Sequence, residues 1–293
     1  MINELITIII ASYNADKYIY ETLESCINQT YKNIQIIISD DCSQDNSVNV
    51  IKQWCEEKKK THPSIECILV TSCQNNGITK NFNNALVHAR GSWIKCLGSD
   101  DILLPTALSD FSERLSLYRD YNNIGAVFTF FETFGHHVTN PQRFPLGWTR
   151  TVSQMRPSWL KRQLVTMHFN NVAPGAFINM KYLGHFDESY RLLEDLPTWI
   201  YLVGNNIPTL FLPFVSVKYR LHDVQVTSSV SPVKKILEND LKIVNNNRFK
   251  NGYYLGYYHN KFNLYLSTKN GKFFRYLKIL NPLNFVIKVF DKF

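Results

Sequence analysis

The stretches LITIIIASYN (residues 5–14) and IQIIISDD (residues 34–41) decide the fold. Each begins with a run of apolar, mostly β-branched residues and ends on polar ones, which is typical of a strand buried on both faces. Between them, Ile19, Leu23 and Ile27 repeat at the spacing of an amphipathic helix. A strand, a helix and a second strand in this order make a βαβ unit, which predicts a parallel sheet.

The alternation of strands and helices continues through the first hundred residues, and the pattern then becomes less regular. The expected strands are 5–11, 34–39, 65–71, 92–97, 125–134 and 209–217, and the expected helices are 16–29, 45–58, 78–89 and 194–204. The predicted fold class is α/β: a Rossmann-like, mostly parallel central sheet flanked by helices, with a C-terminal helical appendage.

Charge and composition divide the chain near residue 230. Residues 1–229 hold 20 Lys+Arg and 21 Asp+Glu, a net charge of −1, whereas residues 230–293 hold 12 and 3, a net charge of +9. Such a basic segment favours a polyanionic partner such as an anionic lipid surface, and the alternative is a solvated helix face. We therefore separate residues 231–293 as a basic, aromatic-rich helical region.

The composition excludes several classes of protein. With 45% hydrophobic and 19% charged residues, the chain is not disordered along its length. No stretch approaches the ~18 continuous apolar residues of a membrane-spanning helix, and no basic segment precedes the first apolar run as in a signal peptide. The six cysteines form no CxxC pair and no zinc-finger spacing, so we expect buried free thiols in a reducing, intracellular compartment.

Polar residues follow the predicted strands of the first half. Ser12, Tyr13 and Asn14 follow the first strand, and the aspartate pairs 40–41 and 100–101 follow the second and fourth. Ligands of parallel α/β sheets bind beyond the carboxyl ends of the strands, so these residues form a candidate site. Adjacent carboxylates favour a divalent cation, because like charges in one site need compensation.

Each of these features has a structural alternative. The 100–101 pair would cap a helix expected around Leu103–Leu108. Glu194 and Asp195 precede an expected helix, where they act either as a general base or as favourable charge at the helix N-terminus. His222 follows a strand-like segment and is either structural or a metal ligand.

Together these segments resemble the inverting family 2 glycosyltransferases of the GT-A fold, including bacterial enzymes of O-antigen and capsule assembly. ITIIIASYNADKYIYETLESCINQTYKNIQIIISDDCSQDNS is similar to the family's opening signature, and NNGITKNFNNAL, WIKCLGSDD, GHFDESYRLLED and YRLHDVQVTSS follow in the family's order. The resemblance covers residues 5–229. It implies a GT-A domain over 1–230, with a nucleotide-sugar half at about 1–105 and an acceptor half at about 106–230.

The resemblance also implies roles for individual residues. Asp195 matches the catalytic base, with Glu194 as its neighbour. The residues implied to hold a divalent cation, Mn²⁺ or Mg²⁺, are Asp101, Asp100 and His222. The residues implied to bind the nucleotide and diphosphate of a UDP-sugar are Ser12, Tyr13, Asn14, Asp41, Lys80 and Asp100.

The implied reaction is a single, metal-assisted displacement that inverts the anomeric centre and moves a hexose or N-acetylhexosamine to an acceptor hydroxyl. The C-terminal region suits a lipid-linked acceptor, because Phe273, Leu277 and Leu280 lie at helical spacing among basic residues. We therefore expect a polyprenyl-diphosphate-linked sugar in O-antigen (lipopolysaccharide) or capsule biosynthesis, and a cytoplasmic protein attached peripherally to the inner face of the cell membrane. The alternative is that the C-terminal helices pack on the catalytic domain.

The sequence departs from the family's pattern at three positions. Gly98 stands where the first aspartate of the DXD-type motif is frequent, which removes one carboxylate and bears on metal dependence. Ala11 replaces a common proline, and Cys42 stands where glycine is frequent.

Three other functions compete with this interpretation. A catalytically weak, nucleotide-binding transferase-like protein is the first, in view of Gly98. A nucleic-acid or anionic-surface binding module acting through the basic tail is the second, but it lacks the expected sheet or helix-turn-helix pattern, and we expect no nucleic-acid partner. A nucleotidyltransferase is the third, and the loop SYNADKY lacks the glycines that would grip a triphosphate.

Overall fold

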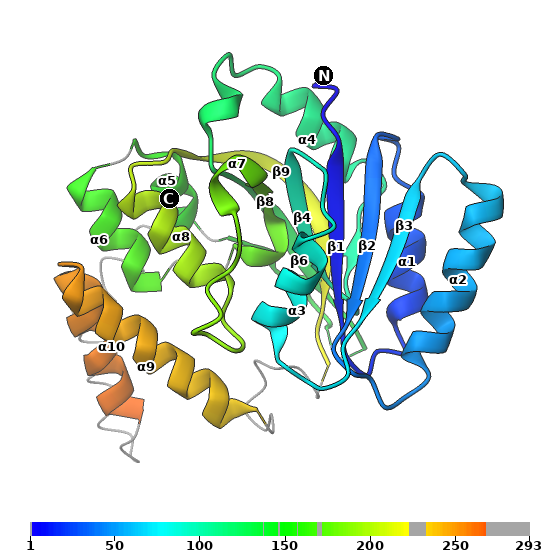
Figure 1. Ribbon diagram of the computed structural model, residues 1–293. Helices are drawn as coiled ribbons and strands as arrows, with labels where there is room; N and C mark the ends of the chain where they lie inside the picture. Colours follow the sequence, from blue (N-terminus) through cyan, green and yellow to red (C-terminus); the bar gives the residue numbers. More distant parts are fainter. Residues whose placement is uncertain are drawn as a thin grey trace.

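The computed structural model describes residues 2–136, 138–145, 147–156, 158–168, 172–222 and 233–267. It shows a central sheet with helices packed against it (Figure 1). The first half consists of β1 (Ile6–Ser12), α1 (Ile19–Ile27), β2 (Ile34–Asp40), α2 (Ser47–Thr61), β3 (Glu66–Thr71), α3 (Ile78–Leu86) and β4 (Trp93–Gly98). These elements confirm the βαβ units expected from the sequence.

The second half mixes short strands and helices. Its strands are β5 (Ile102–Leu103), β6 (Ala126–Phe134), β7 (Arg143–Phe144), β8 (Ala176–Asn179) and β9 (Thr209–Arg220). Its helices are α4 (Ala107–Leu115), α5 (Gly147–Gln154), α6 (Trp159–His168), α7 (Met180–Leu183), α8 (Asp195–Gly204), α9 (Lys234–Lys250) and α10 (Tyr254–Ser267). The sequence pattern predicted β6, β9 and α8 but not α5, α6 or β8.

The described strands form one mixed sheet in the order β3-β2-β1-β4-β8-β6-β9-β5, with β7 paired to β6. The ladders among β3, β2, β1 and β4 are parallel and long, with seven residue pairs between β1 and β2. The antiparallel ladders that join β4 to β8, β8 to β6, β7 to β6 and β5 to β9 have only two or three pairs each. Most of the pairing is therefore parallel, as predicted.

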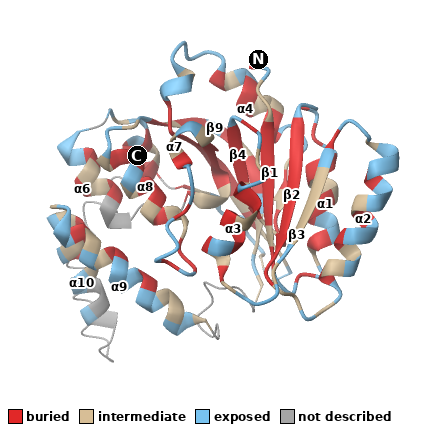
Figure 2. Ribbon diagram, in the orientation of Figure 1, coloured by how far each residue is buried: buried red, intermediate tan, exposed pale blue. Residues whose placement is uncertain are grey.

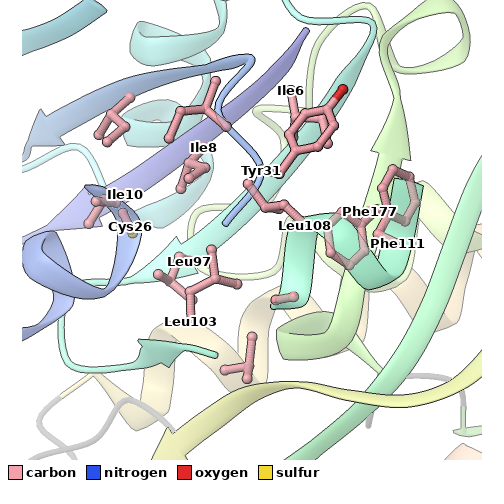
Figure 3. Packing of buried hydrophobic residues seen from close by; sticks show 14 of the residues in the cluster. Ile6, Ile8, Ile10, Cys26, Tyr31, Leu97, Leu103, Leu108, Phe111 and Phe177 are labelled. Atoms are coloured by element: carbon pink, nitrogen blue, oxygen red, sulfur yellow. The ribbon is translucent and has the colours of Figure 1, made fainter. Parts of the chain in front are cut away.

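The sheet separates two hydrophobic cores, and the buried residues concentrate on it (Figure 2). Ile6, Ile8 and Ile10 of β1 face one core, whereas Ile9 faces the other, because side chains alternate across a strand. In the first core, the ring of Phe111 on α4 stacks on Phe177 of β8 with 4.1 Å between centroids. Figure 3 shows these two rings near Leu108.

Two details differ from the sequence-based expectations. The helix expected around Leu103–Leu108 begins only at Ala107, and Ile102–Leu103 is a short strand instead. Thr106 precedes that helix directly, so the prediction that the 100–101 pair caps it is wrong. All six cysteines are free thiols, but only Cys26 is buried, whereas Cys73 is exposed and the other four are partly exposed, which corrects the expectation that all are buried.

Helices α9 and α10 pack on the rest of the chain. Gln163 of α6 joins them, because its side-chain amide donates to the Gly252 carbonyl (2.9 Å) and its oxygen accepts the backbone N–H of Leu255 (3.2 Å). In this part of the C-terminal region, α10 therefore packs on α6, as the packing alternative expected, and its other face is exposed. The apolar residues expected at helical spacing over 273–290 lie outside the described residues. None of the described helices has the length and apolar character needed to cross a bilayer.

Phe111→Ala tests the core around α4. Phe111 is fully buried between Trp93 and Phe177, and removing such a ring costs about 3–5 kcal/mol through lost burial and the cavity that remains. We expect urea denaturation to show a loss of this size. Leu117→Ala, at a position 79% exposed, is the control and should change stability by less than about 0.5 kcal/mol. Equal losses in both variants would contradict the described packing.

Candidate active site

The last residues of β1 and β2 and the loops that follow them form one hydrogen-bonded unit. The parallel register places Ser12 opposite Asp40, and the Ser12 hydroxyl donates to Asp40 Oδ2 (3.1 Å). The backbone N–H of Asp41 donates to the Ser12 carbonyl (2.9 Å). Asp40 also accepts the backbone N–H and hydroxyl of Ser43, so its carboxylate shapes the loop after β2.

Two residues of this unit adopt the left-handed backbone region. Asn14 has φ +49°, and its side chain accepts the backbone N–H of Gln44 (2.8 Å), which ties the loop after β1 to the loop after β2. Cys42 has φ +67°, a region that L residues other than asparagine and aspartate rarely adopt and that glycine adopts without strain. This conformation explains why glycine would suit the position that Cys42 occupies.

The Asp41 carboxylate joins β2 to the start of α3. Its two oxygens accept the backbone N–H groups of Asn76 (2.9 Å) and Gly77 (2.8 Å), and the side chain is 3% exposed. The structure therefore gives Asp41 a scaffolding contact in addition to the nucleotide-binding role predicted for it. Tyr13 and Lys80, two other predicted nucleotide-binding residues, are exposed, and Lys80 lies in the first turn of α3.

A second group lies where β4 and β9 end. The His222 Nε2 atom lies 2.8 Å from Asp100 Oδ2, and both side chains are about three-quarters buried. Asp101 is 4% exposed and accepts the backbone N–H of Arg220 on Oδ1 (3.0 Å). Burial, reinforced by the Asp100 charge, raises the pKa of Asp101 well above its ordinary value. The structure thus brings together the three residues predicted to hold a metal.

Arg220 organises this second group, and the sequence analysis assigned it no role. Its Nε–H donates to the Asp100 carbonyl (2.7 Å), and its guanidinium forms an ion pair with Glu21 of α1. The guanidinium also lies 4.6 Å from the Tyr18 ring centroid and 4.4 Å from that of Phe134. These contacts fix both aspartates relative to α1 and β9. The only sequence signal was its place two residues before His222.

Asp100 and His222 fit a divalent cation as a pair of ligands. Two ligands at neighbouring corners of an octahedron, about 2.1 Å from the ion, lie about 3 Å apart, which is close to the 2.8 Å between Asp100 Oδ2 and His222 Nε2. Within the described residues, no group of three His, Cys, Asp or Glu side chains is arranged to hold a metal. A cation here would therefore need oxygen atoms from a bound diphosphate and water to complete its shell.

Glu194 and Asp195 lie at the start of α8. Burial is the main cause that raises the pKa of Glu194 to about 8 and that of Asp195 to about 6. The Asp195 charge raises the pKa of Glu194 further, whereas backbone N–H groups at the helix start partly offset the shift of Asp195. Burial raises the pKa of the Cys96 thiol on β4, and the charge of Glu194 raises it further.

Three groups of polar side chains make up the candidate site. Exposed Tyr13 directly follows β1, and exposed Lys80 lies in the first turn of α3. In the second group, Asp100 follows β4 and His222 follows β9. The link between these two groups is α1, since Thr22 Oγ1 donates to the Ser99 carbonyl (3.0 Å). The Glu194–Asp195 pair adds carboxyl groups that are partly protonated near neutral pH, as expected of groups that exchange protons with a substrate.

Comparison with known proteins identifies the family. The family model described as Glycosyl transferase family 2 matches residues 7–176. The chain is 39% identical over 123 residues to UDP-Glc:alpha-D-GlcNAc-diphosphoundecaprenol beta-1,3-glucosyltransferase WfaP of Escherichia coli, which covers 41% of this chain and 46% of WfaP. Over such alignments the chain spans about half the length of the first curated relatives, WfaP and Bacillus subtilis EpsE.

Solved structures show the same fold. Staphylococcus aureus TarS 1–349 in complex with UDP-GlcNAc superposes with a TM-score of 0.57 at 17% identity, over 82% of this chain and 65% of that one. The mannosyltransferase PcManGT of Pyrobaculum calidifontis, in complex with GDP-Man and Mn²⁺, gives 0.54 at 15% identity, over 100% of this chain and 83% of that one. The GT-A fold predicted from the sequence is confirmed.

The raised pKa values of the Glu194–Asp195 pair make stability depend on pH. Unfolded carboxyl groups titrate at roughly pH 4, so above that pH the folded protein holds more protons at this pair, and its free energy of unfolding falls as the pH rises toward about 8. Glu194→Gln mimics the protonated acid and removes part of this loss. We expect calorimetry to show a higher Tm than wild type at pH 8.5 but not at pH 4.5.

Asp187→Asn, an exposed position in the preceding loop, is the control for this prediction. Its Tm difference from wild type should change little between the two pH values. A gain for Glu194→Gln that is the same at both pH values would contradict the raised pKa.

Proposed function

We propose that this chain, which belongs to glycosyl transferase family 2, is a glycosyltransferase that moves a hexose or N-acetylhexosamine from a UDP-sugar to a hydroxyl of a lipid-linked sugar, with inversion. The observation that carries this proposal is the Glu194–Asp195 pair at the start of α8, whose carboxyl groups have raised pKa values. We infer that the acceptor belongs to surface polysaccharide assembly, such as O-antigen or capsule.

The named relatives support the donor and acceptor classes. The name of WfaP specifies UDP-Glc as donor and a diphosphoundecaprenol-linked GlcNAc as acceptor, and TarS was solved with UDP-GlcNAc. In this chain, exposed Tyr13 offers a ring for a nucleotide base. Exposed Lys80 in the first turn of α3 offers positive charge for the diphosphate.

Asp195 is the proposed general base. The attacking hydroxyl must lose its proton as it forms the new bond, and a positioned carboxylate takes that proton, which accelerates such reactions by about 10²–10⁴-fold. A pKa near 6 makes Asp195 a stronger base than an ordinary aspartate while leaving it mostly ionised at neutral pH. Glu194 beside it holds a proton more tightly and keeps the local charge low. Asp195 would act on the face of the sugar opposite the departing diphosphate, so the configuration inverts.

Asp100 and His222 would hold the divalent cation, Mn²⁺ or Mg²⁺. When bound, the cation supplies Lewis-acid stabilisation to the diphosphate leaving group. Arg220 keeps Asp100 in place through the bond from its Nε–H to the Asp100 carbonyl. The buried Asp101 fixes the end of β9, and thereby the start of the segment that carries His222.

Asp195→Asn tests this function. The amide cannot accept the proton, so we expect transfer from UDP-glucose or UDP-N-acetylglucosamine to diphosphoundecaprenol-linked GlcNAc to fall about 10²–10⁴-fold. UDP binding should persist: UDP with Mn²⁺ at 100 times its Kd should stabilise both proteins by about 2.7 kcal/mol, and GDP, ADP and CMP should not.

Asp187→Asn, the same substitution at an exposed position, should leave transfer unchanged. Stabilisation of the wild type by none of these nucleotides would refute the proposal. A UDP effect that persists in a chelator would refute the metal assistance alone.

We also propose peripheral attachment to an anionic membrane surface. Tyr254, Tyr258, Phe262 and Tyr265 repeat along one face of α10 and are 41–59% exposed. Aromatic side chains of this kind favour the membrane interface. The net charge of +9 on residues 230–293 adds attraction to anionic lipids. This placement would bring the enzyme to a lipid-linked acceptor.

Vesicle co-sedimentation tests the attachment. We expect the whole chain of 293 residues to bind vesicles that contain 30% phosphatidylglycerol at physiological salt more tightly than phosphatidylcholine vesicles, and less tightly as salt rises. Tyr258→Ser combined with Phe262→Ser should weaken binding several-fold, whereas Tyr118→Ser, an exposed tyrosine after α4, should not. No binding to the anionic vesicles would refute the attachment.

A further inference from the structure

The segment that leads into the Glu194–Asp195 pair is bonded to α9. The backbone N–H of Leu192 donates to Asp240 Oδ2 (2.6 Å), and the Tyr190 hydroxyl accepts the side-chain amide of Asn247 (2.7 Å). Both partners lie on α9, about 50 residues farther along the chain. Figure 1 shows the loop between α7 and α8 lying between α9 and α3.

The contact with α9 is buried. Asp240 is 3% exposed, and Val244, one helical turn farther on, is 1% exposed. Arg248 follows on the same face at 3% and interacts with Tyr190, and burial lowers its pKa to about 10. A carboxylate withdrawn from water and bonded to a backbone N–H makes a strong, directional contact. Its loss would leave the amide of Leu192 without this acceptor.

The start of α3 holds the same segment from the other side. The Arg191 carbonyl accepts the backbone N–H of Thr79 (3.3 Å), and the Arg191 guanidinium donates to the carbonyl and side chain of Asn75 (3.1 Å each). Gly77 has φ +94°, and a Cβ there would lie 2.5 Å from the Arg191 carbonyl oxygen. Gly77 also donates to Asp41, so the segment connects α9 to the proposed nucleotide side of the site.

We propose that Asp240 is a positioning residue for Glu194 and Asp195, and that α9 is therefore part of the catalytic scaffold. Leu192 and Glu194 are two residues apart, which is at most about 7 Å of chain. A shift of the Leu192 backbone would therefore also move the Glu194 and Asp195 carboxyl groups. A misplacement of about 1 Å can cost 10²-fold in rate. The catalytic part of this inference rests on the function proposed above.

Asp240→Ala removes the acceptor, and Asp240→Asn keeps an oxygen that can accept the same N–H. The control is Glu238→Ala, which removes an acidic side chain from an exposed position of α9. Hydrogen exchange measured by mass spectrometry on the full chain should show faster exchange over residues 188–195 in Asp240→Ala, with near wild-type exchange in Asp240→Asn and Glu238→Ala. This readout does not depend on activity.

The kinetic readout separates positioning from general destabilisation. We expect Asp240→Ala to lower kcat by about tenfold or more with UDP affinity within about twofold of wild type, and Asp240→Asn to recover most of the rate. In the Asp195→Asn background, Asp240→Ala should lower kcat little further, because Asp240 is proposed to act through Asp195. Tyr190→Phe, which removes the bond to Asn247, gives a second test if Asp240→Ala does not fold.

Several outcomes would overturn the proposal. The first is that hydrogen exchange over residues 188–195 in Asp240→Ala is as slow as in the wild type. The second is that Asp240→Ala lowers kcat by the same factor in the wild type and in Asp195→Asn. The third is that Asp240→Ala weakens UDP binding by as large a factor as it lowers kcat. If the wild type neither binds UDP nor transfers sugar, the proposed function fails, and the exchange data still decide whether Asp240 fixes the segment.

Discussion

β1 lies in the interior of the sheet, and its pairing on both sides constrains the rest of the structure. Seven residue pairs join it to β2 and six join it to β4, all in parallel register. A slip by one residue would turn Ile6, Ile8 and Ile10 from one core to the other, so the register is strongly specified. The carboxyl ends of these three strands therefore lie at the same end of the sheet, and this fixes where the loops that follow them begin.

Buried ionisable side chains attach the less regular second half to this frame. Asp101 holds the end of β9, and Asp240 holds the segment before α8. Lys95 of β4 is fully buried, donates to the carbonyls of Pro174 and Ala176, and lies 5.1 Å from the centroid of the Phe177 ring. Burial lowers its pKa to about 8. Each contact joins a side chain to distant backbone, so the central strands and the loops of the candidate site depend on the same few groups.

The parts that were predictable from sequence are those with a strong local pattern. The β-branched runs of β1 and β2 and the spacing of Ile19, Leu23 and Ile27 indicate their structure without reference to other segments. The candidate residues at the ends of the strands followed from topology. The structure places His222 beside Asp100 and joins Asp101 to Arg220, whereas their role as metal ligands stays a prediction.

The parts that were not predictable depend on distant partners. Arg220 contacts Asp100, 120 residues away, and Asp240 contacts Leu192, 48 residues away. Helix α5 spans only eight residues, which gives a short pattern. Helix α6 buries Lys161 and Gln163 and exposes Trp159 and Leu160, so its apolar residues do not mark its buried face. The resemblance predicted a nucleotide-binding role for Asp41 from its place in the motif. That place carries no information about the two backbone N–H groups that donate to its carboxylate.

Gly98 and Asp100 constrain one another. A Cβ at position 98 would lie 2.8 Å from Asp100 Oδ1 and 3.3 Å from Asp101 Oδ2. A side chain at position 98 would therefore press on the Asp100 carboxylate, and a turn of that carboxylate would change the contact of its other oxygen with His222. The missing side chain at position 98 thus leaves room for the two carboxylates that follow it.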